Sequence, residues 1–182
     1  MDKENYETID ETFKVGIGSA IISIFLTLIA ICSLLVVYFS IWWGNVNTPT
    51  HTDGYIFLAE MIFIPFLHEY IHSITYRKMA KLPSESVEKI YKFPIYFAVH
   101  YKEIVPVKVR RWASLMPTII LFTLLLIIGL CLNNVVQTII AGFMLGGGSG
   151  DMWNFIKLRK YKSNCFVEDY RELCGCIVYK PK

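Results

Sequence analysis

The sequence has little charge for its length. Asp, Glu, Lys and Arg make up 18% of its 182 residues, whereas an ordinary soluble domain carries about 25%. Two long stretches, 15–52 and 112–150, contain none of these four residue types. Hydrophobic residues reach 54%, and the mean hydropathy is +0.45. Because about 20 apolar residues suffice to cross a bilayer core, these runs exclude a soluble or disordered chain and predict an integral membrane protein.

Other classes of protein are excluded by what is scarce. The net charge of +3 is small, and it is not patterned with exposed aromatic residues, so no nucleic-acid partner is expected. The five cysteines do not form the framework of a small secreted domain. Cys174 and Cys176 lie in the C-terminal tail, and we interpret them as reduced thiols rather than metal ligands, because no matching Cys or His pair stands at zinc spacing.

The apolar stretches predict an all-α membrane protein with four transmembrane helices. The stretch 112–150 is too long for one crossing at ~1.5 Å rise per residue, and Asn133 and Asn134 divide it. The first apolar run is about twice as long as the core of a secretory signal, so we interpret it as a retained anchor. A β-barrel is disfavoured because the runs do not alternate in polarity. The predicted spans are 15–43, 54–76, 112–132 and 135–158.

The loop between the second and third predicted spans is expected to contain short strands at the membrane surface. The segments 87–93, 95–101 and 105–109 are rich in β-branched and aromatic residues, and Pro94 and Pro106 interrupt them. The segment 175–179 in the tail has a similar composition. We therefore predict a short strand-rich cytoplasmic loop between helices two and three.

Every Lys and Arg falls on one side of this predicted topology. The N-terminal flank, the loop 77–111 and the tail from residue 157 contain all 18 of them, and the opposite side contains none. Lys and Arg concentrate in cytoplasmic loops. We therefore expect both termini and the long loop to be cytoplasmic.

The second predicted span contains the sequence His68-Glu69-Tyr70-Ile71-His72. Residues i and i+4 lie above one another on a helix, so the two imidazoles can bind one zinc ion. Glu69 then lies beside the metal, where it can accept a proton from water as a general base. A chance match is the alternative, but ionisable side chains inside a membrane span are costly and indicate function.

Zinc needs a third protein ligand, and we predict Asp151. It is the only acid in the fourth predicted span, it follows the glycine-rich segment 146–150, and it lies at about the same depth as His68 when residues are counted from the outer ends of the spans. The alternative is a solvated acid at the membrane edge. His100 in the loop is the second choice as third ligand. Glu60 is too far from His68 along the helix to share its ion, and it is expected to face another span or a polar cavity.

These residues, with the segment Leu115-Met116-Pro117 and the run 148–151, give the chain a family resemblance. From about residue 54 to 179 it resembles small bacterial membrane proteins grouped as zincin peptidases, which look like minimal relatives of the site-2-protease intramembrane metalloproteases. The resemblance implies that His68, His72 and Asp151 bind zinc and that Glu69 is the general base. It also implies three helices with a membrane-edge sheet between the first two, in the bacterial cytoplasmic membrane.

We therefore expect residues 1–53 to form a flank, a membrane anchor and an outer loop, and residues 54–182 to form a metallopeptidase-like core. The expected activity is that of a zinc metalloendopeptidase that cleaves a membrane-bound peptide or protein near the cytoplasmic leaflet of the bilayer. Two alternatives stay open. One is a non-catalytic metal-binding or transport protein, since intramembrane His, Glu and Asp also mark ion pathways. The other is a scaffold with a vestigial site. Glu69 distinguishes them, because only hydrolysis needs a general base.

Overall fold

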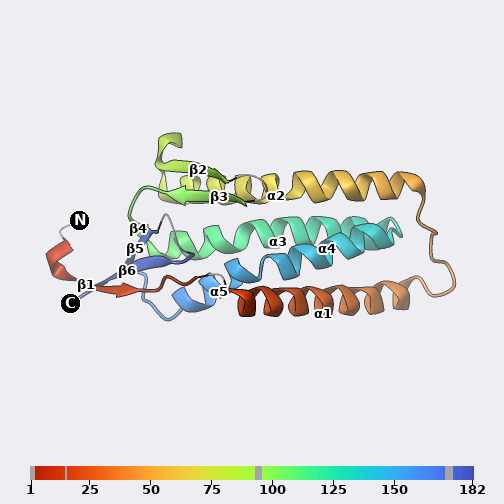
Figure 1. Ribbon diagram of the computed structural model, residues 1–182, viewed down its shortest axis with the longest axis horizontal. Coiled ribbons are helices and arrows are strands. Elements are labelled where there is room, and N and C mark those ends of the chain that lie inside the picture. The colour runs from red at the N-terminus through yellow and green to blue at the C-terminus, as the bar shows by residue number, and fades with distance from the viewer. Residues whose placement is uncertain (1–2, 15, 93–95, 171–173) are drawn as a thin grey trace. The chain divides into compact units, whose positions relative to one another are not determined.

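The computed structural model describes residues 3–14, 16–92, 96–170 and 174–182. The helices in this part of the chain are α1 (Ile17–Ile41), α2 (His51–Ala80), α3 (Val107–Cys131), α4 (Val135–Gly147) and α5 (Ser149–Leu158), with 3-10 turns at Lys3–Asn5 and Ser84–Ser86 (Figure 1). The strands are β1 (Tyr6–Asp10), β2 (Val87–Lys92), β3 (Tyr96–Tyr101), β4 (Val105–Pro106), β5 (Phe166–Asp169) and β6 (Cys176–Pro181).

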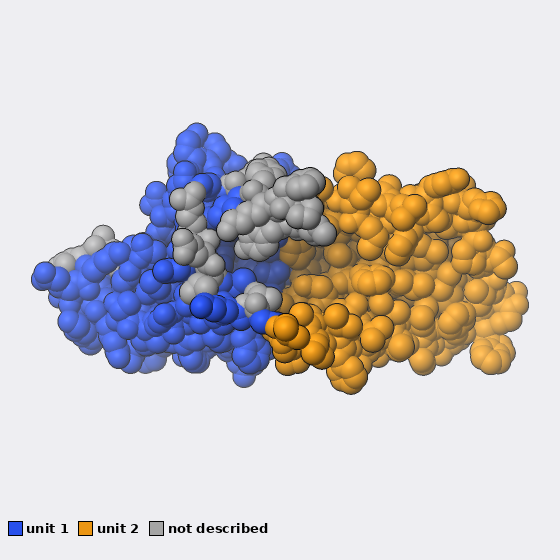
Figure 2. Space-filling model, viewed as in Figure 1, with its two compact units in different colours: residues 1–16, 69–116, 151–182 blue, residues 17–68, 117–150 orange. Residues whose placement is uncertain are grey.

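The chain divides into two compact units, which Figure 2 colours separately. Unit 1 comprises residues 1–16, 69–116 and 151–182, and unit 2 comprises residues 17–68 and 117–150. Unit 1 holds the strands and the charged ends of the helices. Unit 2 is built from apolar helical segments.

Three helices, α1, α2 and α3, are long and apolar enough to cross a membrane. The fourth predicted span, 135–158, is not one helix, because it is divided at Gly148 into α4 and α5. With 13 residues, α4 is about 20 Å long, whereas a bilayer core is ~30 Å thick. The division follows from three consecutive glycines at 146–148, each of which lowers helix stability by ~1 kcal/mol relative to alanine.

The predicted division at Asn133 and Asn134 is confirmed, because α3 ends at Cys131 and α4 begins at Val135. Asn133 has φ = 51°, a left-handed conformation that asparagine tolerates better than most residues. The Asn134 side chain accepts a hydrogen bond from the backbone N–H of Gln137 and so caps α4. Both asparagines therefore have a local structural reason to be in this turn.

The third helix begins at Val107, five residues before the predicted start at residue 112. The strand predicted for 105–109 is therefore wrong beyond Val105–Pro106. The charged residues in the first turns of α3 are tolerated because they find partners. Arg111 donates hydrogen bonds from Nε and Nη2 to the carbonyl oxygen of Leu158, at 2.9 and 2.6 Å.

The predicted strands at 87–93 and 95–101 are confirmed over most of their length. They form the antiparallel pair β2–β3, with Val87 opposite Tyr101 and Lys92 opposite Tyr96. The breaking Pro94 and its neighbours 93 and 95 lie outside the described residues, as does residue 15 at the start of the first span.

A second sheet, in unit 1, joins segments that are far apart in sequence. Its strand order is β1-β6-β5-β4, with every pair antiparallel. The predicted strand near the C-terminus is β6, whereas β1 and β5 were not predicted. Val105, Val167 and Val178 of this sheet are buried and pack in one cluster with Tyr76, Val107 and Leu158. This cluster ties the ends of α2, α3 and α5 to the sheet.

Unit 2 depends on close contact between α1 and α4. A Cβ atom at Gly146 would lie 2.3 Å from the Cα of Thr27, and one at Gly142 would lie 2.9 Å from the Cα of Ile31. Small residues thus let the two backbones approach, a device also common where transmembrane helices pack. Glu60 accepts a hydrogen bond of 2.8 Å from Gln137 Nε2 on α4, which confirms that it faces another helix.

Candidate metal centre

One turn of α2 presents a group of side chains able to hold a metal ion. The ligand atoms of His68, Glu69 and His72 all lie within 4.8 Å of one another. His72 is buried, with 7% of its surface exposed, and the other two are partly buried. The i, i+4 spacing of the histidines produces this geometry because the helix continues without interruption through both residues.

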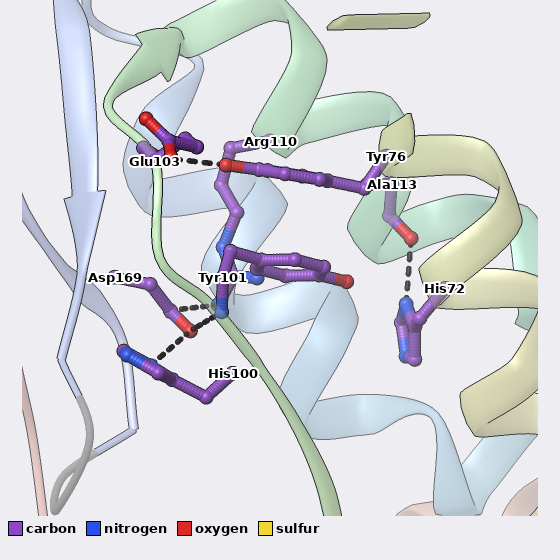
Figure 3. A network of polar contacts seen from close by, with 8 residues as sticks. All are labelled: His72, Tyr76, His100, Tyr101, Glu103, Arg110, Ala113 and Asp169. Carbon is purple, nitrogen blue, oxygen red and sulfur yellow. Dashed lines mark hydrogen bonds and ion pairs between the residues drawn. The ribbon is translucent and has the colours of Figure 1, made fainter. Parts of the chain in front are cut away.

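The His72 ring is oriented by a backbone group of α3. Its Nδ1 lies 2.6 Å from the carbonyl oxygen of Ala113 (Figure 3). A carbonyl oxygen can only accept a hydrogen bond, so Nδ1 carries the proton and Nε2 presents the other side of the ring. Metal-binding histidines are held in this way almost without exception, with the second ring nitrogen donating to a carbonyl or carboxylate.

The predicted third ligand, Asp151, meets His72 at this nitrogen. Asp151 lies in the first turn of α5, and its Oδ2 is 3.3 Å from His72 Nε2. On a tetrahedral zinc with Zn–N and Zn–O distances of ~2.0–2.2 Å, two neighbouring ligand atoms stand ~3.3–3.5 Å apart. The separation of the two atoms therefore fits a shared zinc ion.

The chemistry of this pair requires a cation. With Nδ1 protonated, a neutral His72 points the lone pair of Nε2 at the lone pairs of the Asp151 carboxylate, which repel it. The contact is favourable only if a proton or a metal ion lies between the two atoms. His and Asp are both preferred zinc ligands, so the donor set on the described residues fits zinc.

His100, the second choice as third ligand, has another partner. Its Nδ1 lies 3.2 Å from Asp169 Oδ2, and Asp169 also pairs with Arg110 at 2.8 Å (Figure 3). The same carboxylate accepts a hydrogen bond of 3.1 Å from the backbone N–H of Tyr101. Asp169 thus joins β5, β3 and α3 in one polar network. Only 8% of the Asp169 side chain is exposed.

Two stacked tyrosines lie between this network and α2. The rings of Tyr76 and Tyr101 are 3.8 Å apart and nearly parallel, at 15°. Arg110 lies over the Tyr101 ring, 4.8 Å from its centre. The Tyr76 hydroxyl donates a hydrogen bond of 2.7 Å to the carbonyl oxygen of Glu103. The stack fixes the last turns of α2, one turn beyond His72, against β3.

The sequence gives little indication of this network. The only signal was Arg110 beside a long apolar run, since a buried guanidinium needs a carboxylate partner, but nothing in the sequence indicated that the partner would be Asp169. Of the tail cysteines, Cys176 packs in the apolar cluster of unit 1, and burial raises the pKa of its thiol to about 11.

Comparison with known proteins identifies a family for most of this region. A family described as "Putative zincin peptidase" matches residues 61–166, which is more than half of the chain. The match contains His68, Glu69, His72 and Asp151. No curated protein and no solved structure gave a match.

Proposed function

The chain belongs to the zincin peptidase family, and on that premise we propose that it is a zinc metalloendopeptidase that works within or at the surface of a membrane. His68, His72 and Asp151 hold the zinc ion in this proposal, and Glu69 is the general base. The order of α2, the β2–β3 pair, α3 and the α4–α5 pair supports the resemblance to the site-2-protease core.

One observation carries the proposal above all others. His72 Nε2 and Asp151 Oδ2 meet at 3.3 Å, while His72 Nδ1 is occupied by the Ala113 carbonyl. With Nδ1 already donating, the contact of Nε2 with the Asp151 carboxylate is favourable only with a cation between the two atoms, and in this proposal that cation is zinc. The same contact joins α2 to α5 at Asp151, which follows the glycine-rich break between α4 and α5.

The chain's own residues supply the proton transfers. Zinc, when bound, lowers the pKa of water and polarises a carbonyl group. Glu69 lies one residue after His68, so its carboxylate is beside the ligands and can take a proton from the attacking water. It then passes this proton to the leaving nitrogen. His72, held by Ala113, keeps its ring in one orientation throughout.

The membrane location is supported by the surface of the helices. Large apolar side chains on α1, α2 and α3 are exposed, among them Ile22 at 62%, Phe63 at 67% and Ile127 at 54%. Exposed apolar side chains in this number favour lipid over water. Helices satisfy their own backbone hydrogen bonds and therefore suit that environment.

The sheet of unit 1 supports a common side for the two termini and the loop. β1 precedes α1 and pairs with β6 in the tail, and β4 in the loop pairs with β5. Strands of one sheet lie on one side of a membrane, which the basic residues make the cytoplasmic side. The chain must then return after α3. Together α4 and α5 have 13 and 10 residues, about 35 Å of helix, which is enough for a fourth crossing.

The proposed substrate is a membrane-bound peptide or protein cut near the cytoplasmic leaflet. A peptide must be extended to expose its carbonyl group to attack. The edges of the β2–β3 pair, in the loop directly after α2, are suited to hold an extended chain by strand addition.

The test of this function is Glu69→Gln. The amide keeps the size and hydrogen-bonding capacity of the side chain but cannot accept a proton at neutral pH. We expect the variant to keep its zinc and to lose turnover by at least ~10²-fold, the usual contribution of a positioned acid–base group. Zinc is measured on the purified protein, and turnover by accumulation of uncleaved membrane protein in cells.

Glu60→Gln is the matched control, because it changes a carboxylate two turns earlier on the same helix that bonds to Gln137. It should leave turnover unchanged. Normal processing by Glu69→Gln with zinc bound would remove the general base and with it the peptidase function. A change in metal flux without any processing would favour the transport alternative.

A further inference from the structure

The two stacked tyrosines run in opposite directions. Tyr76 comes from α2 and its hydroxyl points away from that helix, toward Glu103 (Figure 3). Tyr101 comes from β3, and its hydroxyl points the other way, toward the part of α2 that carries His72 (Figure 3). The Tyr76 hydroxyl thus binds the loop at Glu103. The Tyr101 hydroxyl is directed at the candidate metal centre.

Tyr101 is held from several sides. Only 2% of its surface is exposed, its ring lies between Tyr76 and Arg110, and its backbone N–H is bound by Asp169. These contacts use the ring faces and the backbone, and none of them uses the hydroxyl. The hydroxyl is therefore fixed in position before any substrate binds, which is the arrangement that favours stabilisation of developing charge.

The electrostatic environment of Tyr101 agrees with this placement. Burial is the largest cause of a raised pKa at its hydroxyl, and the carboxylates of Glu69 and Asp151 raise the pKa as well. An ordinary tyrosine is already protonated at neutral pH, so this group is a hydrogen-bond donor under all working conditions.

We infer that Tyr101 is a catalytic residue, whose hydroxyl donates a hydrogen bond to the oxygen that becomes negatively charged when water adds to the scissile carbonyl. This role rests on the proposed peptidase function and completes it. Two histidines and Asp151 bind the zinc ion, Glu69 moves the proton, and Tyr101 stabilises the oxyanion. Asp169 and Arg110 are positioning residues for Tyr101.

The bonds and protons balance without another reactant. The water oxygen bonds to the carbonyl carbon, the π electrons move to the carbonyl oxygen, and Glu69 takes one water proton. Tyr101 keeps its proton and only donates a hydrogen bond. The oxyanion then re-forms the C=O bond, the C–N bond pair leaves with the nitrogen, and Glu69 returns the proton to that nitrogen.

Tyr101→Phe tests this role because it removes one oxygen and keeps the ring, so the contacts with Tyr76 and Arg110 persist. The probe is a phosphinic peptide, in which a tetrahedral PO2 group replaces the scissile amide and mimics the oxyanion. Its affinity is measured by calorimetry on the full-length, zinc-loaded protein in detergent. We expect at least ~10-fold weaker binding by Tyr101→Phe with the zinc content unchanged.

Turnover gives a second readout. With casein as the substrate, Tyr101→Phe should lower kcat by ~10²-fold, the usual effect of losing one oxyanion donor, while KM changes little. Tyr76→Phe is the matched control in the same stack. It should lower the thermal stability, because the bond to the Glu103 carbonyl is lost, but it should leave probe affinity and kcat unchanged.

Three results would overturn the role of Tyr101. They are probe affinity equal to wild type in Tyr101→Phe, loss of zinc or of folding in that variant, and an equal loss of probe affinity in Tyr76→Phe. Failure of the peptidase function has different signs, namely no zinc on the wild-type protein or full turnover by Glu69→Gln. Weaker probe binding by Tyr101→Phe alone supports the role of the hydroxyl.

Discussion

Replacing Asp151 gives the most direct test of the metal centre. Asp151→Asn keeps the shape of the side chain but loses its negative charge, and Asp151→Ala removes the group. In the structure, Asp151 Oδ2 and His72 Nε2 are 3.3 Å apart, the ~3.3–3.5 Å separation of two ligands on one tetrahedral zinc. We expect both variants to bind zinc much more weakly than the wild-type protein.

The magnitude follows from the place of Asp151 in the site. Loss of a group that only orients a ligand typically lowers metal affinity 10–100-fold. Direct loss of one of three protein ligands should therefore exceed ~100-fold, which corresponds to at least ~2.7 kcal/mol. Asp151→Asn should fall slightly less than Asp151→Ala, because an amide oxygen is a weak ligand whereas a methyl group is none.

The assay is a titration of the purified protein, in detergent, against a chelator of known zinc affinity, with total zinc measured independently. Asp169→Asn is the matched control. Asp169 is likewise a carboxylate beside a histidine, with His100 Nδ1 at 3.2 Å, but its charge is neutralised by Arg110. This variant should keep zinc at wild-type affinity.

Two results would refute the reasoning. Wild-type zinc affinity in Asp151→Ala would show that the 3.3 Å contact is an ion pair with a protonated His72 and that zinc, if bound, has another third ligand. An equal loss of affinity in Asp169→Asn would show that the site responds to any loss of carboxylate in unit 1 rather than to loss of a ligand.

Two further predictions concern the scaffold. Gly146→Leu should destabilise the protein by ~3 kcal/mol or more, because even a Cβ there would lie 2.3 Å from a Cα atom of α1. The measurement is the midpoint of thermal unfolding in detergent, which should fall. Gly147→Leu is the control that should unfold as wild type, because no atom lies within 4 Å of a Cβ at that position. Burial raises the pKa of Glu11, but hydrogen bonds from Lys160 and Tyr161 outweigh it and hold the pKa below its ordinary value. A carboxyl with a lower pKa in the folded state stabilises the protein above its ordinary range and loses that contribution as the pH falls through the folded-state pKa. Protection of the β1 amides against hydrogen exchange should therefore fall as the pH drops below the ordinary carboxyl range, and a Glu11→Gln variant should lose this part of the acid dependence.

Local composition determined much of the fold. The apolar stretches, two of them free of charged residues, predicted α1 and most of α2 and α3, because a helix in lipid needs little beyond a largely apolar stretch. The turn at Asn133 and Asn134 was predictable for a related reason, since two adjacent polar residues interrupt such a stretch. Where the prediction went wrong, as for Val107 and the residues after it, the cause was tertiary: Arg111 finds the Leu158 carbonyl, so charged residues can begin the helix.

The candidate site likewise has parts that the sequence determined and parts that it did not. The positions of His68, Glu69 and His72 relative to one another follow from helix geometry alone, so their spacing in the sequence was sufficient to predict a shared metal ion. Asp151 was predicted from chemistry and depth, and the structure brings its carboxylate to His72. The zinc itself stays a prediction.

Other parts of the site come from residues distant in sequence. The Ala113 carbonyl that orients His72 lies 41 positions away, and Asp169, which fixes Tyr101, lies 68 positions away. A backbone carbonyl has no sequence signature, and a carboxylate in a short strand can pair with any cation that the fold brings near. The sequence by itself determined the long apolar helices and the turn that carries His68, Glu69 and His72, because both depend on neighbours along one helix. Only the tertiary structure decided which groups orient His72 and toward what the Tyr101 hydroxyl points, because packing between helices and strands sets those contacts.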